Sequence, residues 1–77
     1  NRHLRRLLAG PDLADRLVPG AELFVAGNEK PRGTVTSATS TDDRIVGLGY
    51  VRREVEPPAT VHLGSPDGPE VSVEVLS

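Results

Sequence analysis

Residues 33–53, GTVTSATSTDDRIVGLGYVRR, decide the fold of this chain. Two extended segments flank a polar turn at Ser40–Asp43, and larger and smaller side chains alternate along the second segment. One face of that segment carries Val46, Leu48 and Tyr50, and the other carries Gly47 and Gly49. Such alternation is typical of a β-strand, so the stretch predicts a hairpin.

Short alternating segments continue on both sides of this hairpin, separated by glycine and proline turns. The pattern predicts six strands, at residues 3–8, 22–26, 35–39, 45–52, 59–63 and 71–75. One helical turn is expected after Pro11, with Asp12 as its cap. Glycines at alternate strand positions fit the bends of a small barrel, and closing the sheet removes its exposed edges. We therefore predict an all-β domain over residues 1–77: a closed or nearly closed six-stranded antiparallel Greek-key barrel.

Composition excludes several classes of function. The chain has no cysteine, which removes disulfides, thiolate metal sites and cysteine nucleophiles. Its net charge of −2 gives no general attraction to nucleic acid or an anionic membrane, and one Tyr, one Phe and no Trp provide no stacking platform. No signal peptide or membrane-spanning stretch is visible. We expect no nucleic-acid or membrane partner.

No motif points to catalysis or metal binding. Ser37 and Ser40 have no histidine placed by a nucleophile motif, and residues 47–49, GLG, lie within a strand instead of opening a helix. The two histidines, His3 and His62, are far apart in the sequence. We therefore predict no catalytic residue and no metal ligand.

Three arginines near the start, Arg2, Arg5 and Arg6, give this segment a local positive charge. They are our candidates for docking, onto an acidic partner surface or an anionic ligand. The alternative is that they form a solvated edge, or one that faces another domain.

The hairpin also carries a family resemblance. GTVTSATS, a short polar insert and IVGLGYVRRE resemble the C-terminal barrel of the aminomethyltransferase superfamily, which includes the glycine-cleavage T-protein and the YgfZ-type folate-binding proteins. The matching positions are Gly33, Val35, Thr36, Ser37, Leu48, Gly49, Tyr50 and Val51. The leading NRHLRRLLAG is similar to the segment that enters this barrel in YgfZ-type proteins. The YgfZ branch is favoured because the chain stops soon after Val75, where the T-protein continues.

The resemblance implies that the chain is the C-terminal domain of a longer cytoplasmic protein, linked to tRNA modification and iron–sulfur cluster maintenance. An initial Asn1 in place of methionine also suggests an excised piece. Tetrahydrofolate would be the cofactor of the parent protein, bound mainly by upstream domains that are the expected partners of this barrel. The isolated piece would then neither bind a cofactor nor catalyse a reaction.

Two residues of the motif strand, Tyr50 and Arg52, are the candidate cofactor contacts by this resemblance. A basic side chain there could pair with the glutamate tail of a folate. The alternative is that Tyr50 packs in the barrel with its hydroxyl at the rim and Arg52 is solvated. Two other functions stay open: the barrel of a glycine-cleavage aminomethyltransferase, and a free-standing binding barrel of OB-like or translation-factor-like type.

Overall fold

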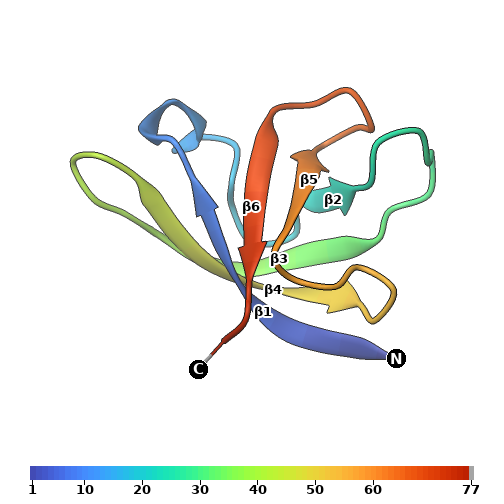
Figure 1. Cartoon of the computed structure of the whole chain (residues 1–77). Coiled ribbons are helices and arrows are strands. Elements are labelled where there is room, and N and C mark those ends of the chain that lie inside the picture. The colour runs from blue at the N-terminus through green and yellow to red at the C-terminus, as the bar shows by residue number, and fades with distance from the viewer. Residues whose placement is uncertain (77) are drawn as a thin grey trace.

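Six antiparallel strands close into a barrel in a computed structural model that describes residues 1–76 (Figure 1). The strands are β1 (Arg2–Ala9), β2 (Glu22–Phe24), β3 (Gly33–Ser40), β4 (Ile45–Arg52), β5 (Ala59–Leu63) and β6 (Glu70–Glu74). Their order around the barrel is β1-β4-β3-β2-β5-β6. The consecutive strands β2, β3 and β4 are neighbours, and β1 lies beside β4 instead of beside β2, which is a Greek-key arrangement. The predicted fold class is confirmed.

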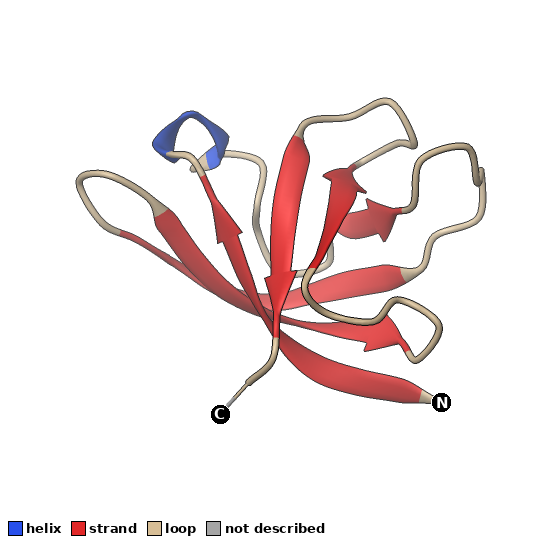
Figure 2. Ribbon diagram, in the orientation of Figure 1, coloured by secondary structure: helices blue, strands red, loops and turns tan. Residues whose placement is uncertain are grey.

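A single short helix interrupts the strands of the described chain (Figure 2). It is the 3-10 helix η1 (Pro11–Leu13), and it begins after Gly10 without a side-chain cap. The predicted cap by Asp12 is therefore wrong, because the turn begins before Asp12: Gly10 holds the cap position, and Asp12 lies inside the first turn. Leu13 and Leu17 are buried, and they pack the segment between β1 and β2 against the core.

Strand limits follow the prediction closely in the middle of the chain and less closely at its short elements. The bounds of β4 and β5 are as predicted. β2 ends two residues early, because the chain turns at Val25, whose carbonyl accepts from the N–H of Asn28, and Gly27 adopts a φ of 80°. β6 ends at Glu74, and the Val75 predicted within it is 53% exposed.

The barrel interior is filled by aliphatic side chains, as expected where every second residue of a strand points inward. Those almost fully buried are Leu7, Leu17, Leu23, Val35, Ile45, Val51, Val61, Val71 and Val73. No polar or charged residue among residues 1–76 is buried as a whole. No helix of this part of the chain is long and apolar enough to cross a membrane.

Glycines line the inner face of β4 because neighbouring strands approach it closely. A Cβ atom on Gly47 would lie 2.8 Å from the carbonyl oxygen of Ser37. One on Gly49 would lie 2.8 Å from the carbonyl oxygen of Thr34 and 2.9 Å from a methyl group of Leu7. Any larger residue at these positions would push the strands apart.

Candidate functional site

The outward face of β1 and β4 is the surface that unites most of the candidate residues. The two strands pair along their whole length, and their outward positions meet as Arg2↔Arg52, Leu4↔Tyr50, Arg6↔Leu48 and Leu8↔Val46. The leucines and Val46 are partly buried, and Tyr50 is 44% exposed. We call these eight residues the arginine-rimmed face, since its apolar middle has arginines along its border.

Tyr50 and Arg52 lie together at one end of this face. The interpretation that Tyr50 packs inside the barrel is wrong, because Gly49 and Val51 hold the inward positions of β4 and leave Tyr50 outside. The guanidinium carbon of Arg2 lies 5.9 Å from the centre of the Tyr50 ring, within range of a cation–π contact.

Arg52 is exposed and takes part in a small charge network. Its Nε lies 3.5 Å from Oε2 of Glu54, and the same oxygen lies 3.2 Å from Nε of Arg32. One carboxylate thus serves two arginines, which leaves a surplus of positive charge here. An anionic group would be attracted to this end of the face.

The three candidate docking arginines do not form one patch. Arg2 covers Tyr50, and Arg6 pairs with Glu74 through Nη2 and Oε1 at 3.2 Å. Arg5 alternates to the other side of β1, opposite Gly49 in the register, and its Nε is buried without a hydrogen-bond partner among residues 1–76. Docking therefore remains a prediction for Arg2 and Arg6 on one face, and for Arg5 at a separate place.

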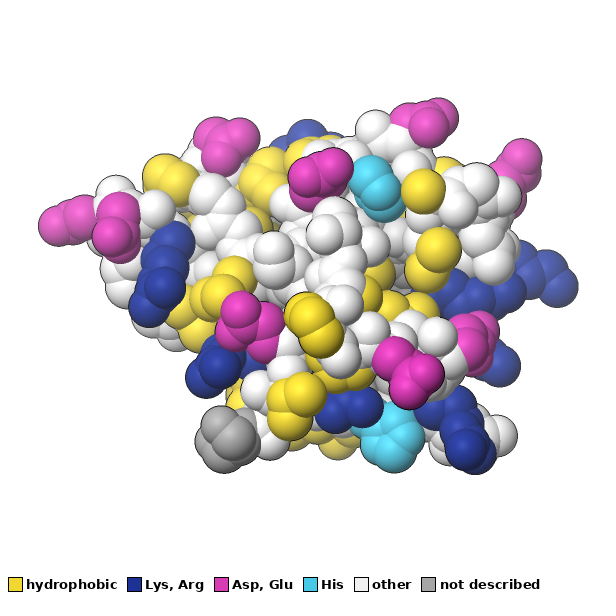
Figure 3. Space-filling view, in the orientation of Figure 1, with side chains coloured by type: hydrophobic (Ala, Val, Ile, Leu, Met, Phe, Trp, Pro, Cys, Tyr) yellow, Lys and Arg dark blue, Asp and Glu magenta, His cyan; other side chains and the backbone are white. Residues whose placement is uncertain are grey.

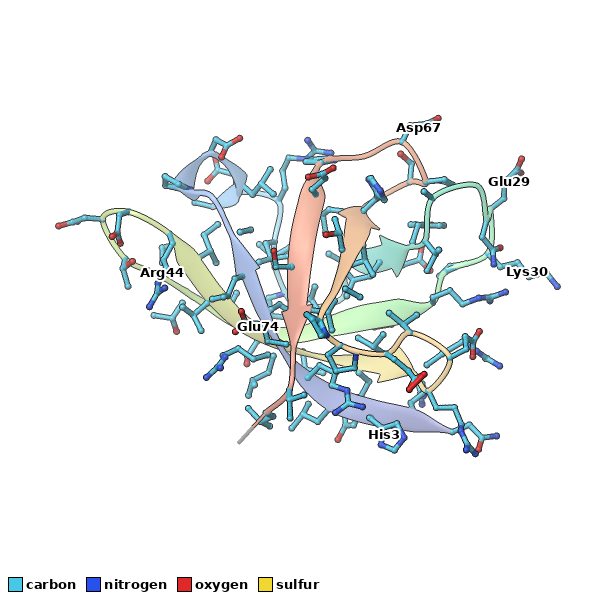
Figure 4. The ribbon with its side chains drawn as sticks, in the orientation of Figure 1. His3, Glu29, Lys30, Arg44, Asp67 and Glu74 are labelled. Atoms are coloured by element: carbon cyan, nitrogen blue, oxygen red, sulfur yellow. The ribbon has the colours of Figure 1, made fainter. Side chains whose placement is uncertain are left out.

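A hollow of about 330 Å³ lies at the opposite end of the arginine-rimmed face, and we call it the Arg44 hollow. Its lining is Arg6, Leu8, Arg44, Val46 and Glu74. Figure 4 shows Arg44 beside the start of β4 and Glu74 at the end of β6. In Figure 3, apolar atoms are visible between basic and acidic groups on this side of the molecule.

Arg44 was missed as a candidate from the sequence. It follows Asp42 and Asp43 in a polar turn, where a charged side chain is ordinary. It lines the same hollow as Arg6 because β1 pairs with β4, strands that are about 40 residues apart in the sequence. Only the strand register brings the two arginines together, and no local pattern shows it.

Another hollow is formed by loops away from the arginine-rimmed face. One of about 500 Å³ lies between the β2–β3 and β5–β6 loops, with Phe24 in its lining and Glu29 and Asp67 on loops at its edge (Figure 4). The nearby His62 is engaged, because its Nδ1 donates to the carbonyl oxygen of Gly68 at 2.8 Å. Within the described residues, no three His, Asp or Glu side chains gather as a metal site would require.

Comparisons with known proteins found no matching family model, no similar curated protein and no similar solved structure. The resemblance to the aminomethyltransferase superfamily therefore rests on the residues quoted above alone.

Proposed function

We propose that the chain is the C-terminal barrel domain of a YgfZ-like, tetrahydrofolate-binding protein of the cytoplasm. In this proposal the barrel docks against upstream domains and closes one side of their folate site, and it carries no catalytic residue. The closed antiparallel barrel of six strands is the fold that the resemblance implies. The observation that carries the proposal is the exposure of Tyr50 and Arg52, both on the motif strand, on one outward face.

Physical reasons favour a contact role for this end of the face. Tyr and Arg are the residue types most often found at the centre of interfaces, because each combines a large contact area with hydrogen-bonding groups. Leu4 adds apolar surface beside Tyr50, and the guanidinium group of Arg2 lies over the tyrosine ring. A folate glutamate tail would find the guanidinium of Arg52 accessible and incompletely neutralised.

Titration with folinic acid tests the proposal. Calorimetry on the full-length protein should show saturable binding, and the 77-residue chain should show none. In the full-length protein, Arg52→Gln should weaken binding about tenfold, the effect of losing one charge-assisted hydrogen bond. Arg53→Gln is the matched control, since it removes an equal charge from the neighbouring residue, and it should leave binding unchanged.

Two results would contradict the proposal. Tight folinic acid binding by the 77-residue chain would show that the barrel makes the site without upstream domains. Equal effects of Arg52→Gln and Arg53→Gln would show that Arg52 has no specific contact. A K-G-C-Y-x-G-Q-E run upstream of Asn1 is the simplest check of the family itself.

A further inference from the structure

We infer that the Arg44 hollow is a docking site for an acidic segment of a partner protein, which inserts one carboxylate between Arg44 and Arg6 and lays apolar side chains over Leu8 and Val46. The hollow lies at the opposite end of the arginine-rimmed face from Tyr50 and Arg52. The inference is therefore independent of folate, and it holds whether or not the parent protein binds that cofactor.

Charge gives the first argument. Arg6 forms an ion pair with Glu74. Oε1 of Glu74 lies 3.3 Å from Nε and 3.2 Å from Nη2 of Arg6. Arg44 forms no ion pair with the residues that the structure describes. Two guanidinium groups, those of Arg6 and Arg44, and one carboxylate, that of Glu74, thus line the hollow, which leaves one positive charge unbalanced. Guanidinium groups bind a carboxylate through two parallel hydrogen bonds, so a second carboxylate is the complementary group.

The floor of the hollow gives the second argument. Leu8 and Val46 are directly opposite each other on β1 and β4, and both are partly exposed. Leu48 and Leu4 continue this apolar strip toward Tyr50 over four residues, or about 13 Å at the usual rise of a strand. A small carboxylate would cover the hollow and leave the strip in water. A protein segment with an acidic residue next to apolar ones covers both.

Strand pairing decides how the segment binds. β4 is paired with β1 on one side and β3 on the other, and Arg6–Leu8 of β1 lie between β4 and β6. The backbone groups around the hollow are therefore already bonded within the barrel. An incoming segment cannot add a strand here, so its affinity comes from side chains alone.

Glu74 acts as an internal competitor for the incoming carboxylate. It occupies Arg6 while the hollow is empty, and both side chains are 40% exposed, so their ion pair exchanges at little cost. Replacing Glu74 with glutamine would free Arg6 and raise the positive charge of the hollow. The site should then bind an acidic segment more tightly, which is the opposite of what a simple loss of structure would do.

The experiment is an NMR titration of the ¹⁵N-labelled chain with a blocked peptide, GVELVG, and with its control GVQLVG. We expect saturable shifts of the Leu8, Arg44 and Val46 amides with the first peptide only, decreasing as salt is added. Arg44→Gln should weaken binding about fivefold to tenfold, and Glu74→Gln should tighten it about threefold. Arg53→Gln, which removes the same charge outside the hollow, should change nothing.

Several outcomes would overturn the inference. The first is that GVELVG shows no saturable binding, or that GVQLVG binds as tightly as GVELVG. The second is that Arg44→Gln and Arg53→Gln change the affinity equally. The third is that Glu74→Gln weakens binding of the peptide. Hexanoate binding as tightly as the peptide would assign the hollow to a small carboxylate. Concentration-dependent dimerisation, measured by sedimentation and abolished by Arg44→Gln, would assign it to a second copy of the chain. Urea unfolding of each variant shows whether the barrel is intact.

Discussion

The two faces of β4 are the most informative comparison in this molecule. The inner face carries Ile45, Gly47, Gly49 and Val51, and the outer face carries Val46, Leu48, Tyr50 and Arg52. Judged by apolar side chains, the outer face looks like the one to be buried, yet it is the outer face that meets water. Steric exclusion determines which face of β4 points inward, because Leu7 and two backbone carbonyls occupy the volume that side chains at Gly47 and Gly49 would need. The larger apolar residues are thereby left free for contacts.

The largest effect that follows from this difference concerns the leucines of β1. Leu7 points inward and is fully buried, whereas its neighbour Leu8 is on the outer face and partly exposed. Leu7→Ala should lower the free energy of unfolding by about 3 kcal/mol, because it leaves a cavity in the core, and Leu8→Ala by about 1 kcal/mol. Urea denaturation measures both. Equal losses would mean that the two faces of the sheet are not distinct.

Substitutions on the two faces of β4 test the same comparison with a smaller expected loss of unfolding free energy. Gly49→Ala should cost about 2 kcal/mol, because its new methyl group would meet the carbonyl oxygen of Thr34, which cannot move without opening the β3–β4 pairing. Leu48→Ala, one residue earlier on the outer face, should cost about 1 kcal/mol or less. Thermal unfolding followed by circular dichroism compares the two variants. A tolerated Gly49→Ala would remove the packing explanation for the glycines.

The contact between Arg2 and Tyr50 should give the smallest effect. At 5.9 Å and with the ring half exposed, a cation–π contact contributes about 0.5 kcal/mol. A double-mutant cycle with Arg2→Ala and Tyr50→Leu isolates this coupling from the apolar contribution of the ring. A coupling energy of zero would mean that Arg2 contributes nothing to the position of Tyr50, which would then depend on Leu4 and on the strand itself.

Much of the fold was predictable because its signals are local. Proline and glycine mark the turns, and the alternation of Ala59–Leu63 and Ile45–Arg52 gave both strands their observed bounds. The Asp12 cap failed because the 3-10 turn begins directly after Gly10, so the cap position falls on a residue without a side chain. The predicted end of β2 is two residues too late, because the partner strands β3 and β5 each pair with only two of its residues.

The candidate site was less predictable because it depends on register. Tyr50 and Arg52 are found from the motif strand, but their orientation follows from the close approach of β3 and β1 to Gly49. The meeting of Arg6 with Glu74 and of Leu8 with Val46 needs three strands from distant parts of the chain. A sequence shows which strands exist more readily than which residues they bring together.

The most direct test of the division between an inner structural face and an outer contact face is a pair of neighbouring substitutions, Tyr50→Thr and Val51→Thr. Threonine suits a strand at both positions, so strand propensity does not disfavour either variant. Measured by urea unfolding, Val51→Thr should cost about 2 kcal/mol, because it buries a hydroxyl group in the aliphatic core, and Tyr50→Thr less than about 1 kcal/mol. An equal or larger loss for Tyr50→Thr would contradict the account, because it would place the outer face among the structures that hold the barrel together.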